Sequence, residues 1–226
     1  MTATDTVTRS EALARLGNAR LALITDSRGD AGRLRTLVAA AIDGGVRAVQ
    51  LREPSLTAAE LAALCDALRP RLDAVSGLLF VNDRVDVAVA CGAHGVHLGC
   101  RSLPPARVRA QLPSGCLVGF SAHDSTELAA AAAAGVDYVS LSPVLPTVCK
   151  PGAAALGLAA TAALVGQAPV PVVWLGGIDA HTIEEVGRHA PFAVAVRGAI
   201  CDSPDPAAAA RALVLALTPP RATRTA

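Results

Sequence analysis

The segment Val172-Val173-Trp174-Leu175-Gly176-Gly177-Ile178 decides the fold class, because an unbroken apolar run passes directly into a pair of glycines. Strands covered on both faces have such continuous apolar runs, whereas a strand with one solvated face alternates between apolar and polar residues. Ala48-Val49-Gln50-Leu51 has the same character. Both segments therefore predict strands of a parallel sheet that is covered on both faces.

Similar apolar runs recur along the chain and alternate with longer segments rich in alanine and leucine. They predict strands at 21–25, 47–51, 77–81, 95–98, 117–120, 137–141, 170–175 and 192–196. The segments between and after them predict helices at 31–44, 57–70, 84–91, 104–112, 125–134, 155–166, 179–189 and 206–217. Such alternation indicates βα units, and the predicted fold is a single (β/α)8 TIM barrel of the α/β class over residues 20–217.

A doubly wound open sheet is the alternative fold. It would call for a Gly-x-Gly-x-x-Gly loop after the first strand, but Ile24-Thr25-Asp26-Ser27-Arg28 stands there. The two ends of the chain, residues 1–19 and 218–226, are polar or rich in proline and arginine, and we expect them to be flexible tails.

Composition limits the class of function. The 226 residues are 52% hydrophobic and 17% charged, which excludes a disordered chain. A net charge of +1 with three Phe, one Tyr and one Trp gives no case for nucleic-acid binding. We expect no membrane contact, because no apolar run is long enough to span a bilayer. Six cysteines without a Cys-x-x-Cys pair indicate reduced thiols and a cytoplasmic protein, and a homo-oligomer is left open.

Polar residues follow the predicted strands at one end of the barrel, where active sites of this fold lie. Glycines in Gly176-Gly177 and at Gly198 would let backbone N–H groups approach a phosphate, and the alternative is that they form ordinary tight turns. The cations Arg52, Lys150 and Arg197 suit a phosphorylated small molecule, and the alternative is scattered surface charge. Gln50 shares the face of Arg52, since the two are separated by two positions of a strand.

Three further polar residues leave two interpretations open. Asp83 follows a buried strand and is a candidate Mg²⁺ ligand, or an acid that stabilises the start of the next helix. His97 and His123 are candidate acid/base groups, but a structural role with satisfied hydrogen bonds is the favoured interpretation for each.

The strand-end motifs together resemble the thiamine phosphate synthase / TenI family, over about residues 21–217. They are Ile24-Thr25-Asp26, Val49-Gln50-Leu51-Arg52-Glu53, Val81-Asn82-Asp83-Arg84-Val85-Asp86, Gly95-Val96-His97-Leu98-Gly99, Ser142-Pro143-Val144-Leu145-Pro146-Thr147 and Gly176-Gly177-Ile178. The resemblance implies a thiamine biosynthesis enzyme that joins hydroxymethylpyrimidine diphosphate to thiazole phosphate and releases diphosphate. It also implies phosphorylated small-molecule substrates and Mg²⁺.

The same resemblance implies a role for each candidate residue. Those that would hold the pyrimidine diphosphate are Gln50, Arg52, Asn82, Ser121 and Lys150, with Arg52 and Lys150 as the catalytic cations. Those that would line the thiazole phosphate site are Thr147, Cys149, Gly177, Arg197 and Gly198. Asp83 would be one Mg²⁺ ligand.

Several positions depart from the synthase pattern. Pro54 stands where a synthase usually has lysine, Cys149 where threonine is common, and Ser102 where the second acidic metal ligand is expected. These departures imply a weak, substrate-assisted Mg²⁺ site. The alternative functions are a TenI-type thiazole tautomerase, although Pro143 stands at the position of its histidine, and a regulator that binds a phosphorylated ligand without catalysis.

Overall fold

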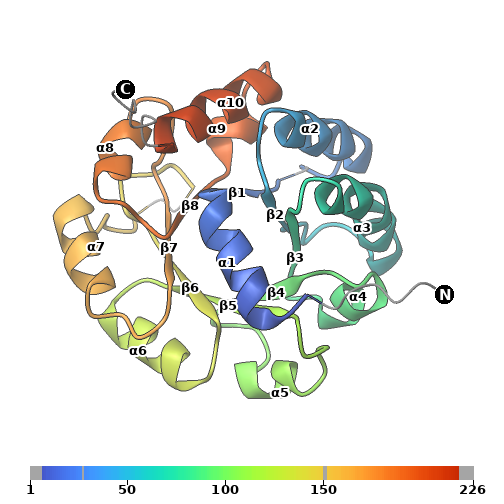
Figure 1. The fold of residues 1–226 in the computed structure, drawn as a ribbon, viewed down its shortest axis with the longest axis horizontal. Helices are drawn as coiled ribbons and strands as arrows, with labels where there is room; N and C mark the ends of the chain where they lie inside the picture. Colours follow the sequence, from blue (N-terminus) through green and yellow to red (C-terminus); the bar gives the residue numbers. More distant parts are fainter. Residues whose placement is uncertain (1–6, 27, 150–151, 219–226) are drawn as a thin grey trace, which may run out of the picture.

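The strands form one closed barrel. The computed structural model describes residues 7–26, 28–149 and 152–218. Each strand pairs in parallel with its neighbours in sequence, and β8 pairs with β1 through Leu21 and Val194 (Figure 1). The strands are β1 (Leu21–Ile24), β2 (Ala48–Leu51), β3 (Leu78–Asn82), β4 (Gly95–Leu98), β5 (Leu117–Ala122), β6 (Tyr138–Leu141), β7 (Val172–Leu175) and β8 (Ala193–Val196). The (β/α)8 prediction is confirmed, and the open sheet is excluded.

Helices surround the barrel on its outside (Figure 1). They are α2 (Ala31–Asp43), α3 (Ala58–Asp73), α4 (Val85–Ala90), α5 (Pro105–Arg109), α6 (Ser125–Ala133), α7 (Leu158–Val165), α8 (Ile183–Arg188), α9 (Gly198–Cys201) and α10 (Pro206–Leu217). The sequence did not predict α9, because four residues are too few to show a helical period. Within the described ranges, none of the helices has both the length and the apolar character that crossing a membrane requires.

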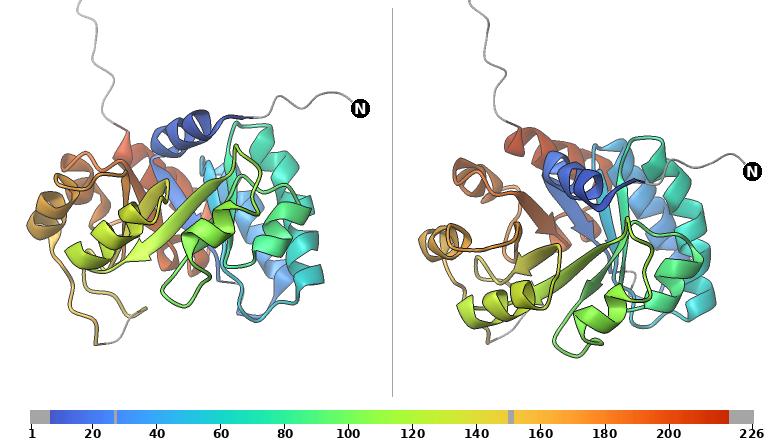
Figure 2. Two further views of the ribbon diagram at one scale, coloured as in Figure 1. Left: turned by 90° about the horizontal axis from the view of Figure 1, so that it is seen from below. Right: turned by 60° about the horizontal axis from the view of Figure 1, so that its bottom comes forward.

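One helix corrects the expectation of a flexible N-terminal tail. Residues Arg9–Ala19 form α1, which begins with a capping box between Thr8 and Glu11. Its buried residues Ala12 and Leu16 pack on the barrel interior, and α1 lies across the end from which the strands begin (Figures 1 and 2). The burial of this apolar face explains why the segment is ordered. Residues 1–6 and 219–226 lie outside the described part of the chain.

The barrel interior changes from apolar to polar along the strand direction. Alternate residues of each strand point inward, so Leu78, Phe80 and Asn82 follow one another up β3. On β5 the last inward residue is Ser121, which is likewise polar. The polar side chains therefore gather at the carboxyl ends of the strands, opposite α1.

Candidate active site

A chain of hydrogen bonds joins the ends of β2, β3 and β4. Gln50 Nε2 donates to Asn82 Oδ1 at 3.0 Å, and Asn82 Nδ2 donates to Asp83 Oδ2 at 2.8 Å. The second oxygen of Asp83 accepts from the hydroxyl of Ser102, which itself accepts from Gly99 N at 2.6 Å. The structure thus brings together Gln50, Asn82 and Asp83, and adds Ser102 as a direct partner of the carboxylate.

The backbone at Asp83 explains how this carboxylate reaches the mouth of the barrel. Asp83 has a positive φ of 59°, a conformation that aspartate tolerates better than most residues. Its N–H donates to His97 O at 3.1 Å, which ties the turn to β4. The side chain is consequently exposed beyond the strand, although residues 78–81 of β3 are buried and Asn82 is half-buried.

Arg52 is positioned by two residues to which the sequence analysis gave no role. Its backbone N–H donates to Thr25 Oγ1 at 3.0 Å, and the Thr25 hydroxyl donates to the carboxylate of buried Glu53. The Arg52 side chain itself is exposed at the mouth. The sequence contained a signal for this support, since Thr25 directly follows β1 and Glu53 lies two positions beyond β2, but only the closed barrel brings the two residues together.

Arg197 occupies the other side of the mouth, at the end of β8. Its Nη2 lies 2.8 Å from Cys149 Sγ, and its Nη1 lies 3.3 Å from Asp26 Oδ2. Cys149 N donates to Thr147 Oγ1 at 3.2 Å, which shapes the loop after β6. Three predicted residues therefore share one cluster, and Asp26 joins it from the loop after β1.

Gly177 and Gly198 lie on the Arg197 side of the barrel mouth, and a larger side chain would meet a different obstacle at each. Gly177 has a φ of +69°, and a Cβ there would lie 2.5 Å from Pro146 O. The approach of the loops after β6 and β7 thus requires this glycine, whether or not a ligand binds. At Gly198, which begins α9, a Cβ would lie 2.9 Å from Asp202 Oδ2.

The two histidines have structural partners, as the favoured interpretation held. His97 is buried, with Nδ1 3.1 Å from Tyr138 OH and Nε2 3.0 Å from Ser121 Oγ. Burial lowers the pKa of His97 to about 4, so its imidazole is neutral near pH 7. His123 Nδ1 lies 2.7 Å from Glu127 Oε2, within the start of α6. Ser121, by contrast, is only half-buried at the end of β5.

Few of the described side chains at the barrel mouth could bind a metal ion. Among the described residues, no three His, Cys, Asp or Glu side chains gather as a metal-binding group. Asp83 supplies one carboxylate, with the Ser102 hydroxyl hydrogen-bonded to it. Mg²⁺ prefers oxygen ligands and often binds through one or two carboxylates plus substrate phosphates, so these residues fit a site that the substrate completes. Lys150 lies outside the described residues.

Comparison with known proteins identifies the family. Residues 21–200 match the family model "Thiamine monophosphate synthase". The chain belongs to this family. A thiamine-phosphate synthase of Thermobifida fusca is 44% identical over 207 residues, covering 88% of this chain and 92% of the relative. A thiamine-phosphate synthase of Mycobacterium bovis is 40% identical over 215 residues, covering 90% of this chain and 97% of the relative.

A solved structure of the same family supports the fold. Thiamine phosphate pyrophosphorylase from Pyrococcus furiosus superimposes with a TM-score of 0.81 at 30% identity, covering 90% of this chain and 97% of that chain. The resemblance inferred from the strand-end motifs is therefore confirmed, as is the assignment of the chain to a family of enzymes.

Proposed function

We propose that this chain is the transferase that joins hydroxymethylpyrimidine diphosphate to a thiazole phosphate and releases diphosphate. The observation that carries the proposal is the division of the barrel mouth into two clusters. One cluster is the hydrogen-bonded chain from Gln50 to Ser102, and the other surrounds Arg197. A reaction between two phosphorylated molecules needs two such subsites facing one another.

The first cluster supplies what the pyrimidine diphosphate needs. Gln50 and Asn82 present amide groups whose orientation their mutual hydrogen bond fixes. Arg52, together with Lys150, would bind the diphosphate, because guanidinium and ammonium groups form strong charge-assisted hydrogen bonds with phosphate oxygens. Ser121 would contact the same substrate from β5.

The second cluster suits the thiazole phosphate. Arg197 is partly exposed and held by Asp26, so its guanidinium is oriented before a ligand arrives. Thr147, Cys149, Gly177 and Gly198 would line the rest of this subsite. The N–H groups at the start of α9 and beside Gly177 would add hydrogen bonds to the phosphate oxygens.

The chemistry follows from this arrangement. The C–O bond between the pyrimidine methylene and the diphosphate breaks, the bonding electrons leave with the diphosphate, and the thiazole nitrogen forms the new C–N bond. Positive charge develops on the methylene while negative charge develops on the leaving oxygen. Arg52 and Lys150 would stabilise the negative charge on the leaving oxygen. Electrostatic stabilisation of this kind is usually the largest single contribution to catalysis.

The metal would be held by Asp83, with the Ser102 hydroxyl beside it. When bound, Mg²⁺ supplies charge neutralisation at the diphosphate. Because a single carboxylate is present, we expect metal binding to be weak in the free protein and to strengthen when diphosphate is bound.

Two alternatives are less well supported. A tautomerase would need an acid/base group over the thiazole, but Pro143 stands at the end of β6 and buried His97 is engaged with Tyr138 and Ser121. A binding protein without catalysis would not need the chain of amides and carboxylate at β2, β3 and β4. We also propose a cytoplasmic location, since all six cysteines are free thiols.

The test is turnover of the two substrates by the purified protein, with Mg²⁺ and with a chelator. We expect thiamine phosphate and diphosphate in equal amounts and a steep dependence on Mg²⁺. Binding of both substrates without product would support the regulator instead, and conversion of a thiazole isomer alone would support the tautomerase.

A further inference from the structure

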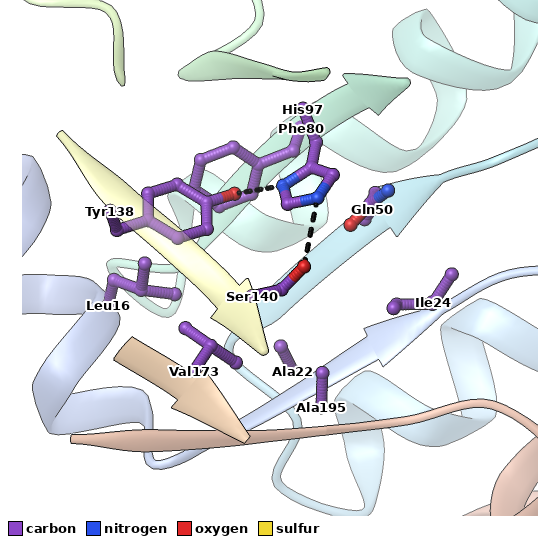
Figure 3. A pocket seen from close by; sticks show the side chains of 10 residues that line it. All are labelled: Leu16, Ala22, Ile24, Gln50, Phe80, His97, Tyr138, Ser140, Val173 and Ala195. Carbon is purple, nitrogen blue, oxygen red and sulfur yellow. Dashed lines mark hydrogen bonds between the residues drawn. The ribbon is translucent and has the colours of Figure 1, made fainter. Parts of the chain in front are cut away.

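The interior of the barrel holds a polar cluster that the proposed chemistry does not use directly. Tyr138, His97 and Ser140 are buried and face one another inside the barrel (Figure 3). Tyr138 OH lies 3.1 Å from His97 Nδ1, and His97 Nε2 lies 3.0 Å from Ser121 Oγ and 3.2 Å from Ser140 Oγ. The cluster therefore connects the centre of the barrel to a serine at its mouth.

The direct contacts of this cluster favour one arrangement of its protons. Within the described residues, His97 Nδ1 is the hydrogen-bond partner of Tyr138 OH. If Nδ1 carried the proton, the phenolic O–H would be a buried donor without an acceptor, which costs about 1–3 kcal/mol. Tyr138 therefore donates to Nδ1. The same argument excludes a doubly protonated ring, so the imidazole carries a single proton, on Nε2.

The same direction of hydrogen-bond donation continues from His97 to Ser121. Nε2–H is shared between Ser121 Oγ at 3.0 Å and Ser140 Oγ at 3.2 Å, and the hydroxyl of Ser140 donates to Ser121 Oγ at 3.4 Å. Ser121 Oγ therefore accepts from His97 and Ser140, which occupies its acceptor capacity within the cluster, because a hydroxyl accepts at most two hydrogen bonds. The O–H of Ser121 makes none of these contacts and is left to donate to a ligand at the mouth.

We propose that Tyr138 and His97 are positioning residues that make Ser121 a hydrogen-bond donor, and not an acceptor, toward the substrate. The acceptor would be a ring nitrogen or a phosphate oxygen of the pyrimidine diphosphate. This inference rests on the proposed function for the identity of the substrate, but the direction of the hydrogen bonds is a property of the protein alone.

Neighbouring residues leave room for the hydrogen bond between Tyr138 and His97 and pack against the tyrosine ring. A Cβ on Gly119 would lie 2.5 Å from Tyr138 OH and 2.6 Å from His97 Nδ1, so only glycine leaves room for that hydrogen bond. Phe80 packs edge-on against Tyr138, with ring centroids 5.7 Å apart. Tyr138, His97 and Ser140 themselves line a cavity of about 20 Å³, whose other walls are mainly apolar side chains such as Leu16 and Val173 (Figure 3).

The first experiment reads the tautomer directly. In protein with ¹⁵N-labelled histidine, side-chain NMR of the five histidines distinguishes a protonated Nε2 from a protonated Nδ1. The His97 signals are assigned by comparison with His97→Gln. We expect one Nε2–H form in the wild type and a mixture in Tyr138→Phe, in which the donor to Nδ1 is lost. A protonated Nδ1 in the wild type would overturn the proposal.

The second experiment reads the effect on Ser121 through a double-mutant cycle. Tyr138→Phe should raise KM for the pyrimidine diphosphate by about three- to tenfold, the size of one hydrogen bond, and leave KM for the thiazole phosphate unchanged. In a Ser121→Ala background the same substitution should have no further effect on that KM. Additive effects in the cycle would refute the coupling.

A control separates this role from general packing. Phe80→Leu disturbs the same interior layer without touching a hydrogen bond of the cluster, so it should lower Tm but leave the His97 tautomer and both KM values unchanged. If Phe80→Leu raises KM for the pyrimidine diphosphate as much as Tyr138→Phe does, the effect is structural and the proposal fails. Absence of turnover in the wild type would count against the proposed function, while the tautomer measurement, which needs no substrate, would still decide the direction of the hydrogen bonds.

Discussion

The Ser102→Asp substitution tests the metal half of the proposed site. Ser102 Oγ now donates to Asp83 Oδ1, so the substitution replaces a hydrogen-bond donor with a second negative charge in contact with the first. Two unit charges about 4 Å apart repel by about 1 kcal/mol in water and about 4 kcal/mol near a protein surface. Because Asp83 is exposed, we take the lower value.

This repulsion should appear as a metal-dependent loss of stability. For a chain of this size, about 1 kcal/mol corresponds to a fall in Tm of about 2–4 °C. When Mg²⁺ is bound, the added carboxylate should be favourable instead of unfavourable. Its attraction to the ion is about 2 kcal/mol in water, or about thirtyfold in affinity. We therefore expect the Mg²⁺ concentration at half-maximal initial rate to fall by about ten- to thirtyfold in the variant.

The assay compares thermal unfolding and initial rates for wild type, Ser102→Asp and Ser102→Asn. The asparagine variant has the shape of the aspartate without its charge, so it should show neither the fall in Tm in chelator nor the gain in Mg²⁺ affinity. If the aspartate and asparagine variants melt at the same temperature in chelator and share one Mg²⁺ dependence, the metal does not bind at Asp83.

Three other outcomes follow from the structure. Arg52→Ala should weaken binding of the pyrimidine diphosphate by about 2–5 kcal/mol if the guanidinium pairs with a desolvated phosphate, and wild-type affinity in calorimetry would remove Arg52 from the site. Leu16→Ala should destabilise the fold by about 2–5 kcal/mol, because Leu16 is 2% exposed at the base of the barrel; urea unfolding measures this, with kcat unchanged as the control. The free energy of unfolding should fall as pH falls from about 6.5, the ordinary pKa of histidine, to about 4, because over this interval His97 takes up a proton in the unfolded chain while the buried imidazole stays neutral. The free energy of unfolding of His97→Gln should accordingly change less over that interval than that of the wild type, and identical pH profiles would contradict the assignment.

Much of the fold could be predicted because its signal is local. Each strand is a short apolar run ended by polar residues or glycine, and the parallel arrangement follows from the absence of alternation in segments such as Val172–Leu175. The candidate residues at the strand ends follow from the same local rule, since a barrel exposes the carboxyl ends of all its strands at one face. Gln50, Asn82 and Asp83 were selected as candidates in this way, and the structure places them in one hydrogen-bonded chain.

Other features depend on contacts that no local pattern contains. The segment Arg9–Ala19 looks polar in sequence, and it is a helix because closure of the barrel leaves an apolar end that Ala12 and Leu16 can cover. The hydrogen bonds of His97 join residues 41 and 24 positions away in the chain, Tyr138 and Ser121. The sequence by itself determined the barrel and the face on which its polar residues gather. Only the tertiary structure decided which of those residues touch, because the stagger of the strands around a closed barrel sets which inward side chains lie at the same height.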